Sequence, residues 1–168
     1  MIWFRPQCRV LFVCTANVCR SPLAEGLLRS RLHAMGLGRR VAVRSAGTSV
    51  GQPGRRPDPR AAKLAAAAGV SLRGIRARPL RARMIEHSDF VLVMEHRHLA
   101  EVASLMPGQE LPGNVFLLGG FAAGRGQGAE DILDPYYGDL HGFTEVFALI
   151  DAALSGFAGC LEERFAAP

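Results

Sequence analysis

The chain of 168 residues has little lysine and few large aromatics, and it lacks a long uninterrupted hydrophobic run. A membrane-spanning helix needs about 20 consecutive apolar residues, so none is expected here. The N-terminal stretch, Met1 to Arg9, has no apolar region followed by small residues, which argues against a secretory signal peptide. Together these absences predict a cytoplasmic protein with no membrane insertion.

Paired metal-ligand motifs are also missing. The four cysteines are Cys8, Cys14, Cys19 and Cys160, and no two of them form a C-x-x-C pair. The sequence also has no pair of histidines at the spacing of structural zinc ligands. This spacing argues against a structural zinc site, so we expect no metal and no other cofactor. In a reducing cytosol the four cysteines are expected to be free thiols.

What the chain does have is arginine. Lys63 is the only lysine, so arginine supplies nearly all of the formal net charge of +5. Five arginines fall between Arg73 and Arg83 without interleaved aromatics for base stacking, which favours a solvated charged face over a nucleic-acid site. The basic charge is therefore a weak indication of acidic partners rather than of nucleic acid.

Short apolar segments alternate with segments of helical periodicity. Strands are predicted at residues 9–13, 41–46, 89–94 and 114–118, and helices at 22–36, 60–68, 97–106 and 143–165. This order predicts one α/β domain spanning residues 1–168. We expect a three-layer fold whose central, mostly parallel four-stranded sheet has helices on both faces. Residues 73–83 show no clear period, and residues 119–140 are expected to form a long loop.

The loop from Cys14 to Ser21 (CTANVCRS) joins the first predicted strand to the first predicted helix. Backbone N–H groups at such a turn bind anions and stabilise a thiolate. The planar guanidinium of Arg20 binds two oxygens of an oxyanion at once. A cysteine and an arginine on one anion-binding loop therefore indicate nucleophilic attack on phosphorus.

The segment VLFVCTANVCRSPLAE, residues 10–25, closely resembles the active-site segment of the low-molecular-weight protein tyrosine phosphatases. Four further segments resemble landmarks of that family: SAGT at 45–48, PDPR at 57–60, DFVLVME at 89–95 and DPYYG at 134–138. The resemblance covers nearly the whole chain. It implies a cysteine-dependent phosphatase that hydrolyses phosphotyrosine on proteins through a phosphocysteine intermediate.

The resemblance implies three catalytic roles. Cys14 would attack phosphorus, Arg20 would bind the phosphate oxygens, and Asp134 would protonate the leaving oxygen and then activate water. Asp131 lies close to Asp134 in the sequence, and position alone does not separate them. Asp134 is preferred because it heads the DPYY segment.

The remaining site residues also follow from the resemblance. Phosphate binding and loop support fall to Thr15, Ala16, Asn17, Val18, Cys19, Ser21 and Ser45. Ser21 would donate a hydrogen bond to the thiolate, and Asn17 would hold the loop, since asparagine tolerates left-handed backbone. Tyr136 and Tyr137 would form walls of the substrate pocket.

The cysteines beyond the nucleophile receive different roles. Cys19 would guard Cys14 against overoxidation by forming a reversible disulfide with it. A small buried filler is the alternative role for Cys19. Cys8 and Cys160 have no motif around them, and both are interpreted as structural.

The sequence departs from the family pattern at three positions. Ala16 replaces the usual glycine of the loop, and Ile75 replaces a histidine that would support it. Near Gly51, where many members present a tryptophan or tyrosine to the substrate ring, residues 49–53 contain no aromatic. One wall of the pocket is therefore expected to be missing, which predicts a higher KM for aryl phosphates than a Gly51→Trp variant would show.

Three other functions remain open. Protein arginine phosphatases are more closely related to this family than arsenate reductases are, but they favour threonine where this chain has the apolar Val18. An arsenate reductase would need relay cysteines, and none lies between Cys19 and Cys160. The third is a non-catalytic phosphate-binding or nucleic-acid-binding module. The expected partner is a tyrosine-phosphorylated protein, for example a bacterial tyrosine kinase, and the expected state is a monomer or weak dimer.

Overall fold

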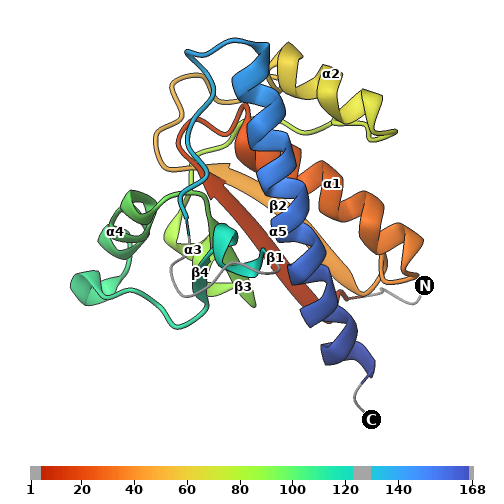
Figure 1. The fold of residues 1–168 in the computed structure, drawn as a ribbon. Coiled ribbons are helices and arrows are strands. Elements are labelled where there is room, and N and C mark those ends of the chain that lie inside the picture. The colour runs from red at the N-terminus through yellow and green to blue at the C-terminus, as the bar shows by residue number, and fades with distance from the viewer. Residues whose placement is uncertain (1–4, 123–129, 167–168) are drawn as a thin grey trace.

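The computed structural model describes residues 5–122 and 130–166. Its sheet has four parallel strands in the order β2-β1-β3-β4 (Figure 1). The strands are β1 (Cys8–Cys14), β2 (Val41–Gly47), β3 (Phe90–Val93) and β4 (Val115–Leu117). The predicted α/β fold with a four-stranded parallel sheet is therefore confirmed.

Helices follow the strands much as the periodicity predicts. They are α1 (Arg20–Ala34), α2 (Pro59–Ala67), α3 (Ala82–Glu86), α4 (His96–Ser104) and α5 (Leu140–Ala166), with short 3-10 turns η1 (Pro107–Gln109) and η2 (Leu118–Phe121). Helix α1 begins at Arg20, two residues before the predicted start. Helix α3 was not predicted, because five residues are too few to show a period.

The two faces of the sheet carry separate cores. Along β1, Val10 and Phe12 pack with α1 and α5, whereas Leu11 and Val13 pack with residues from α3 and α4. Figure 1 shows α1 and α5 crossing one face of the sheet, with α4 beyond its other side. Because β1 is buried on both faces, its sequence is a continuous apolar run rather than an alternating one. The expected three layers are present.

The length and composition of helix α5 depart from the expectation that no segment could cross a membrane. By length and composition alone this helix is long and apolar enough to do so. Its buried stripe, however, includes Phe143, Ile150 and Phe157, which belong to the core of the domain. A Cβ on Gly156 would lie 1.7 Å from the carbonyl oxygen of Phe121, so this glycine lets η2 pack directly on the helix. Core packing accounts for the apolar composition.

The carboxyl end of β1 is tied closely to the end of β2. Cys14 is in register with Gly47, and the Thr48 amide donates to the Cys14 carbonyl at 2.9 Å. A Cβ on Gly47 would lie 2.5 Å from the Thr15 carbonyl oxygen, so only glycine allows this approach. The fold thereby fixes the start of the loop after Cys14 at the edge where open α/β sheets bind ligands.

The structure separates the two cysteines that were interpreted as structural. Cys8 is fully buried in the core, as expected. Cys160 is exposed on α5, so it does not share the buried packing role of Cys8.

Candidate active site

The phosphate loop, residues 14–20, depends on a left-handed residue at Asn17, whose φ is 55°. Its buried side chain is fixed at both ends: the amide nitrogen donates to Ser21 Oγ at 2.8 Å, and the amide oxygen accepts from the Arg78 backbone N–H at 2.9 Å. The role inferred from residue type thus agrees with the geometry. Ala16 does not adopt a positive φ, so its methyl group causes no strain of that kind.

Ser21 lies directly beneath the sulfur of Cys14. The distance from Cys14 Sγ to Ser21 Oγ is 2.9 Å, and both side chains are buried. Because Asn17 donates to the same hydroxyl, the hydroxyl proton is left to the sulfur or to the more distant Ala46 carbonyl at 3.4 Å. A hydroxyl that donates to sulfur stabilises the thiolate relative to the thiol.

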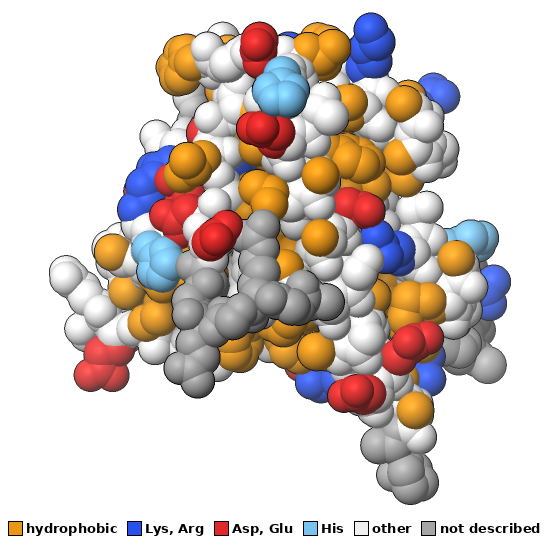
Figure 2. Space-filling model, in the orientation of Figure 1, with side chains coloured by type: hydrophobic (Ala, Val, Ile, Leu, Met, Phe, Trp, Pro, Cys, Tyr) orange, Lys and Arg blue, Asp and Glu red, His pale blue; other side chains and the backbone are white. Residues whose placement is uncertain are grey.

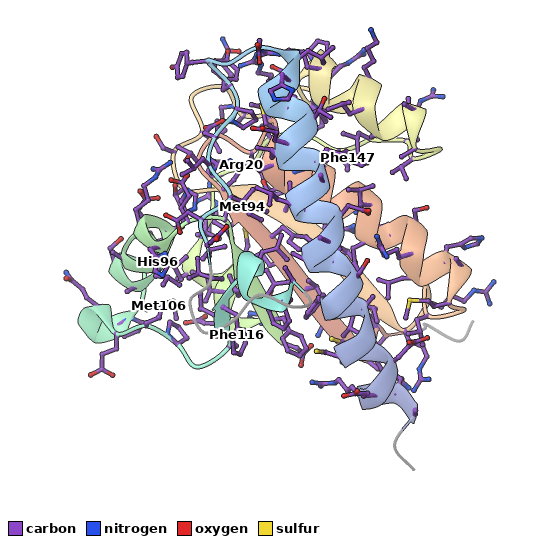
Figure 3. The ribbon with its side chains drawn as sticks, viewed as in Figure 1. Arg20, Met94, His96, Met106, Phe116 and Phe147 are labelled. Carbon is purple, nitrogen blue, oxygen red and sulfur yellow. The ribbon has the colours of Figure 1, made fainter. Side chains whose placement is uncertain are left out.

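Arg20 is 1% exposed and holds the centre of the site (Figure 3). Its Nη1 donates to Glu95 Oε1 at 2.5 Å and to the Ile132 carbonyl at 2.8 Å, while Nη2 lies 3.2 Å from Asp134 Oδ2. Its buried Nε has no hydrogen-bond partner. A buried donor without a partner costs about 1–3 kcal/mol, and an oxyanion on the loop would satisfy it.

Glu95 fixes the orientation of that guanidinium, a role the sequence did not reveal. It follows β3 and accepts from Arg20 and also from Arg97, whose Nη2 lies 3.0 Å from Oε1. Although burial favours the protonated carboxyl, hydrogen bonds from Arg97 and Arg20 lower the pKa of Glu95 to about 2. Glu95 ends the segment DFVLVME, so the available signal was its position at the carboxyl edge of a buried strand.

His98 supports the loop from the α4 side. This fully buried ring lies 3.0 Å from Thr15 Oγ1 through Nε2, and its Nδ1 accepts from the Glu95 backbone N–H. Burial, together with the charges of Arg20 and Arg97, lowers the pKa of His98 to about 4. The ring is therefore neutral near pH 7, with its proton on Nε2 and donated to Thr15.

This buried histidine predicts an acid-dependent loss of stability. The folded pKa of His98 is about 4 and the ordinary value is 6.5, so the unfolded chain binds the proton first as the pH falls. The contribution of His98 should therefore lower stability between pH 6.5 and 4, by on the order of 3 kcal/mol, and that contribution should level off below this window. Urea unfolding across this range should show a flatter profile for His98→Gln. The exposed His33→Gln variant serves as control, and equal slopes in both variants would contradict the assignment.

Asp134 and Asp131 lie in different surroundings. Asp134 lines the same cavity as Cys14, and its Oδ1 accepts from the Tyr136 backbone N–H at 3.0 Å. Asp131 Oδ1 instead lies 2.8 Å from the His96 backbone nitrogen and 2.6 Å from His96 Nδ1. Asp131 is not among the residues that line the cavity. Geometry therefore favours Asp134 as the acid, as the DPYY position did.

The cavity above the loop has a volume of about 530 Å³. It is lined by Cys14, Thr15, Ala16, Val18, Cys19, Arg20, Ser49, Gly51, Gln52, Arg55, Arg97, Asp134, Tyr136 and Tyr137. The rings of Tyr136 and Tyr137 meet edge to face at 5.0 Å, and Tyr137 is 96% exposed at the mouth. The structure thus brings the expected nucleophile, arginine, acid and tyrosines together.

Arg60 of the PDPR segment forms hydrogen bonds to the DPYYG segment, which carries Asp134. Its guanidinium donates to the carbonyl oxygens of Tyr136 and Gly138 and pairs with Asp58. The Asp58 side chain also accepts from the Arg60 backbone N–H at the start of α2. The PDPR segment therefore begins α2 and also positions the DPYYG segment.

Ser45 and Ile75 lie away from the cavity lining. The Ser45 hydroxyl donates to Glu25 Oε2 on α1 at 2.5 Å, so it ties β2 to the helix. Ile75 is buried among apolar residues of the core. Ile75 therefore provides apolar packing and no side-chain hydrogen bond, whereas His98 contacts Thr15 of the loop at 3.0 Å.

Cys19, by contrast, lines the cavity beside the nucleophile. Burial, with the charges of Asp58 and Asp134, raises the pKa of its thiol far above the ordinary range. These surroundings favour the protonated form of the Cys19 thiol.

At Gly51 there is free space for the aromatic side chain that this chain lacks. It lines the cavity, and a Cβ built on it meets no atom within 4 Å. Gly51→Trp should therefore supply the missing wall and lower KM for aryl phosphates by about 2- to 10-fold, the value of one aromatic contact. Steady-state kinetics against Gly51→Ala, which adds no ring, checks this. An unchanged KM in the tryptophan variant would mean that this segment does not face the substrate ring.

The chain matches, over residues 9–166, the family described as low molecular weight phosphotyrosine protein phosphatase. It is 35% identical over 156 residues to the low molecular weight protein-tyrosine-phosphatase of Streptomyces coelicolor, covering 93% of this chain and 94% of that protein. Solved YfkJ from Bacillus subtilis is 26% identical with a TM-score of 0.86, covering 95% of this chain and 98% of that one. YwlE arginine phosphatase from Geobacillus stearothermophilus is 27% identical with a TM-score of 0.79, covering 94% of each chain. The protein therefore belongs to the low-molecular-weight protein-tyrosine phosphatase family.

Proposed function

We propose that this protein hydrolyses phosphotyrosine on proteins, with Cys14 as the nucleophile. The observation that carries the proposal is the buried, unpartnered Nε of Arg20 on the loop that presents Cys14, with Asp134 across the same cavity. A phosphate bound there would satisfy the orphan donor and present its phosphorus to the sulfur. Cys14, Arg20 and Asp134 all belong to one domain, residues 1–168.

In the first step, Cys14 Sγ attacks phosphorus and the bond from phosphorus to the phenolic oxygen breaks. Asp134 gives its proton to that oxygen, so the product leaves as a neutral phenol. The Arg20 side chain and the loop amides hold the equatorial oxygens, where charge develops.

In the second step, water attacks phosphorus and the phosphorus–sulfur bond breaks. Asp134, now a carboxylate, accepts a proton from that water, and Cys14 returns as the thiolate. The Asn17–Ser21 pair keeps a hydrogen-bond donor near the sulfur in both steps. Inorganic phosphate leaves, so the enzyme is regenerated without a cofactor or an external reductant.

The proposal also covers the other residues of the loop, the partner protein, the location and the oligomeric state. We assign Thr15, Ala16 and Val18 to the phosphate-binding loop and Cys19 to protection of Cys14 by a reversible disulfide. The partner is a tyrosine-phosphorylated protein, such as a bacterial tyrosine kinase. The protein acts in the cytoplasm, as a monomer or weak dimer.

Turnover of a chromogenic aryl phosphate in the presence of EDTA tests the reaction class. We expect full activity, because within residues 5–122 and 130–166 no three His, Cys, Asp or Glu side chains are placed to hold a metal. Loss of turnover in EDTA, restored by a divalent metal, would contradict the proposal.

A second comparison separates phosphotyrosine from phosphoarginine as substrate. Val18 is 3% exposed and packs in an apolar cluster beside the loop, which favours an aromatic ring over a polar guanidinium. A phosphotyrosine protein should therefore be hydrolysed faster than a phosphoarginine protein at equal concentration. The reverse order would identify an arginine phosphatase with the same chemistry.

A further inference from the structure

The five arginines between Arg73 and Arg83 have no part in the reaction, and the structure divides them. Arg78 donates its backbone N–H to Asn17, and Arg81 and Arg83 are exposed. Arg73 and Arg76 instead line a groove of about 770 Å³. Arg56 lines the same groove, and so do apolar residues that include Pro57, Ala62 and Ala66. The groove therefore combines three cations with apolar side chains.

The three cations of this groove lack acidic partners. Among the residues that the structure describes, no ion pair involves Arg56, Arg73 or Arg76. The hydrogen bond from Arg76 Nη1 goes to the neighbouring Ile75 carbonyl. Around the active site, by contrast, Arg20, Arg60 and Arg97 each face a carboxylate.

Charge is distributed differently on the face that carries α5. There, acidic and basic side chains are interspersed with hydrophobic ones (Figure 2). In the groove, by comparison, three arginines lie together without an ion pair among the described residues.

The floor of the groove is held rigidly by the core. Val70 and Leu72 are buried, and a Cβ on Gly26 of α1 would lie 2.3 Å from the Leu72 side chain. Gly69 and Gly74, with φ of 74° and 88°, turn the chain at either end of this segment. Arg73 therefore extends from a segment anchored on α1, so the groove is formed before any partner binds.

One short segment separates the groove from the active-site cavity. Arg55 lines the cavity, and its neighbour Arg56 lines the groove. The Ala77 N–H donates to the Arg55 carbonyl at 2.9 Å, and the Asp58 N–H donates to the Val18 carbonyl at 2.7 Å. These two hydrogen bonds connect residues 55–58 to the chain next to Arg76 and to the phosphate loop.

We propose that this groove docks an acidic, partly apolar segment of the phosphoprotein substrate while its phosphotyrosine occupies the cavity. Carboxylates would pair with Arg56, Arg73 and Arg76, and apolar side chains would cover the alanines and Val70. The inference rests on the proposed function, because the groove is adjacent to the site of that reaction. It narrows the substrate class to phosphotyrosine proteins with acidic residues near the modified tyrosine.

The test compares two phosphotyrosine peptides that share a core, one of which carries an acidic extension. In the triple variant Arg56→Gln/Arg73→Gln/Arg76→Gln, kcat/KM for the acidic peptide should fall about 10-fold, the scale of three exposed charge pairs. Values for the plain peptide and for p-nitrophenyl phosphate should stay within about twofold.

The control is Arg39→Gln/Arg81→Gln/Arg83→Gln, which removes the same charge at exposed positions outside the groove. An equal fall in the control would mean general electrostatic attraction, and no fall in either variant would also overturn the proposal. Fluorescence anisotropy with an unphosphorylated acidic peptide measures docking without catalysis. Loss of this binding in the groove variant alone would therefore support docking even if the protein failed to hydrolyse aryl phosphates.

Discussion

Replacing Cys14 with serine is expected to lower kcat for aryl phosphates by at least about 10⁴-fold, the scale on which loss of a nucleophile acts. A serine hydroxyl stays protonated in this loop, and its closest side-chain partner is another hydroxyl, that of Ser21, rather than a base. Binding of the phosphate should persist, because Arg20 and the loop are unchanged. Single-turnover kinetics with the purified variant measures the loss.

The matched control is Cys160→Ser, which replaces an exposed cysteine on α5. It should retain wild-type kcat, and its unfolding transition should coincide with that of the parent. If Cys14→Ser kept as much as a tenth of the activity, sulfur would not be the attacking atom. Binding of a nonhydrolysable phosphonate shows whether the loop of the inactive variant is still folded.

Replacing Asp134 with asparagine should lower kcat for phosphotyrosine by about 10²–10⁴-fold. An amide gives up no proton to the phenolic oxygen and activates no water. KM is not expected to rise, because the substitution also removes the carboxylate that lies 3.2 Å from Arg20 Nη2 and competes with phosphate for it. The loss of kcat should be smaller for p-nitrophenyl phosphate, whose leaving group needs less protonation.

Asp131→Asn is the control for this variant, since Asp131 contacts His96 rather than the cavity. Its kcat should stay within a few-fold of the wild-type value. Comparing the kcat of both variants for the phosphotyrosine peptide identifies the acid directly, because the large loss should occur in Asp134→Asn alone. A larger loss in Asp131→Asn would reverse the assignment.

The parts of the fold that sequence could predict are those with local signals. The apolar run of β1 and the loop after it indicated both a parallel sheet and the place of the site. The left-handed conformation at Asn17 followed from residue type, because few other side chains tolerate it. The single-turn helix α3 and the exposure of Cys160 carry no such signal.

The parts that sequence could not predict depend on contacts between distant residues. Glu95 lies 75 positions from Arg20, and His98 lies 83 positions from Thr15. The position of Glu95 after a buried strand was a local signal for the edge of the sheet, but nothing local indicates that it contacts Arg20 or that His98 contacts Thr15. Only the parallel register of β1 and β3 places them under the phosphate loop. The same holds for Arg73 and Arg76, whose shared groove with Arg56 is visible only in three dimensions.

The covalent intermediate on Cys14 is the most direct test of the whole account. Rapid acid quenching during turnover of saturating phosphotyrosine peptide, followed by peptide mapping with mass spectrometry, locates the phosphoryl group. We predict a phosphorylated Cys14 in the wild-type protein and none in Cys14→Ser. A phosphoryl group on any other residue, or steady turnover with no phosphorylated protein at any quench time, would contradict it.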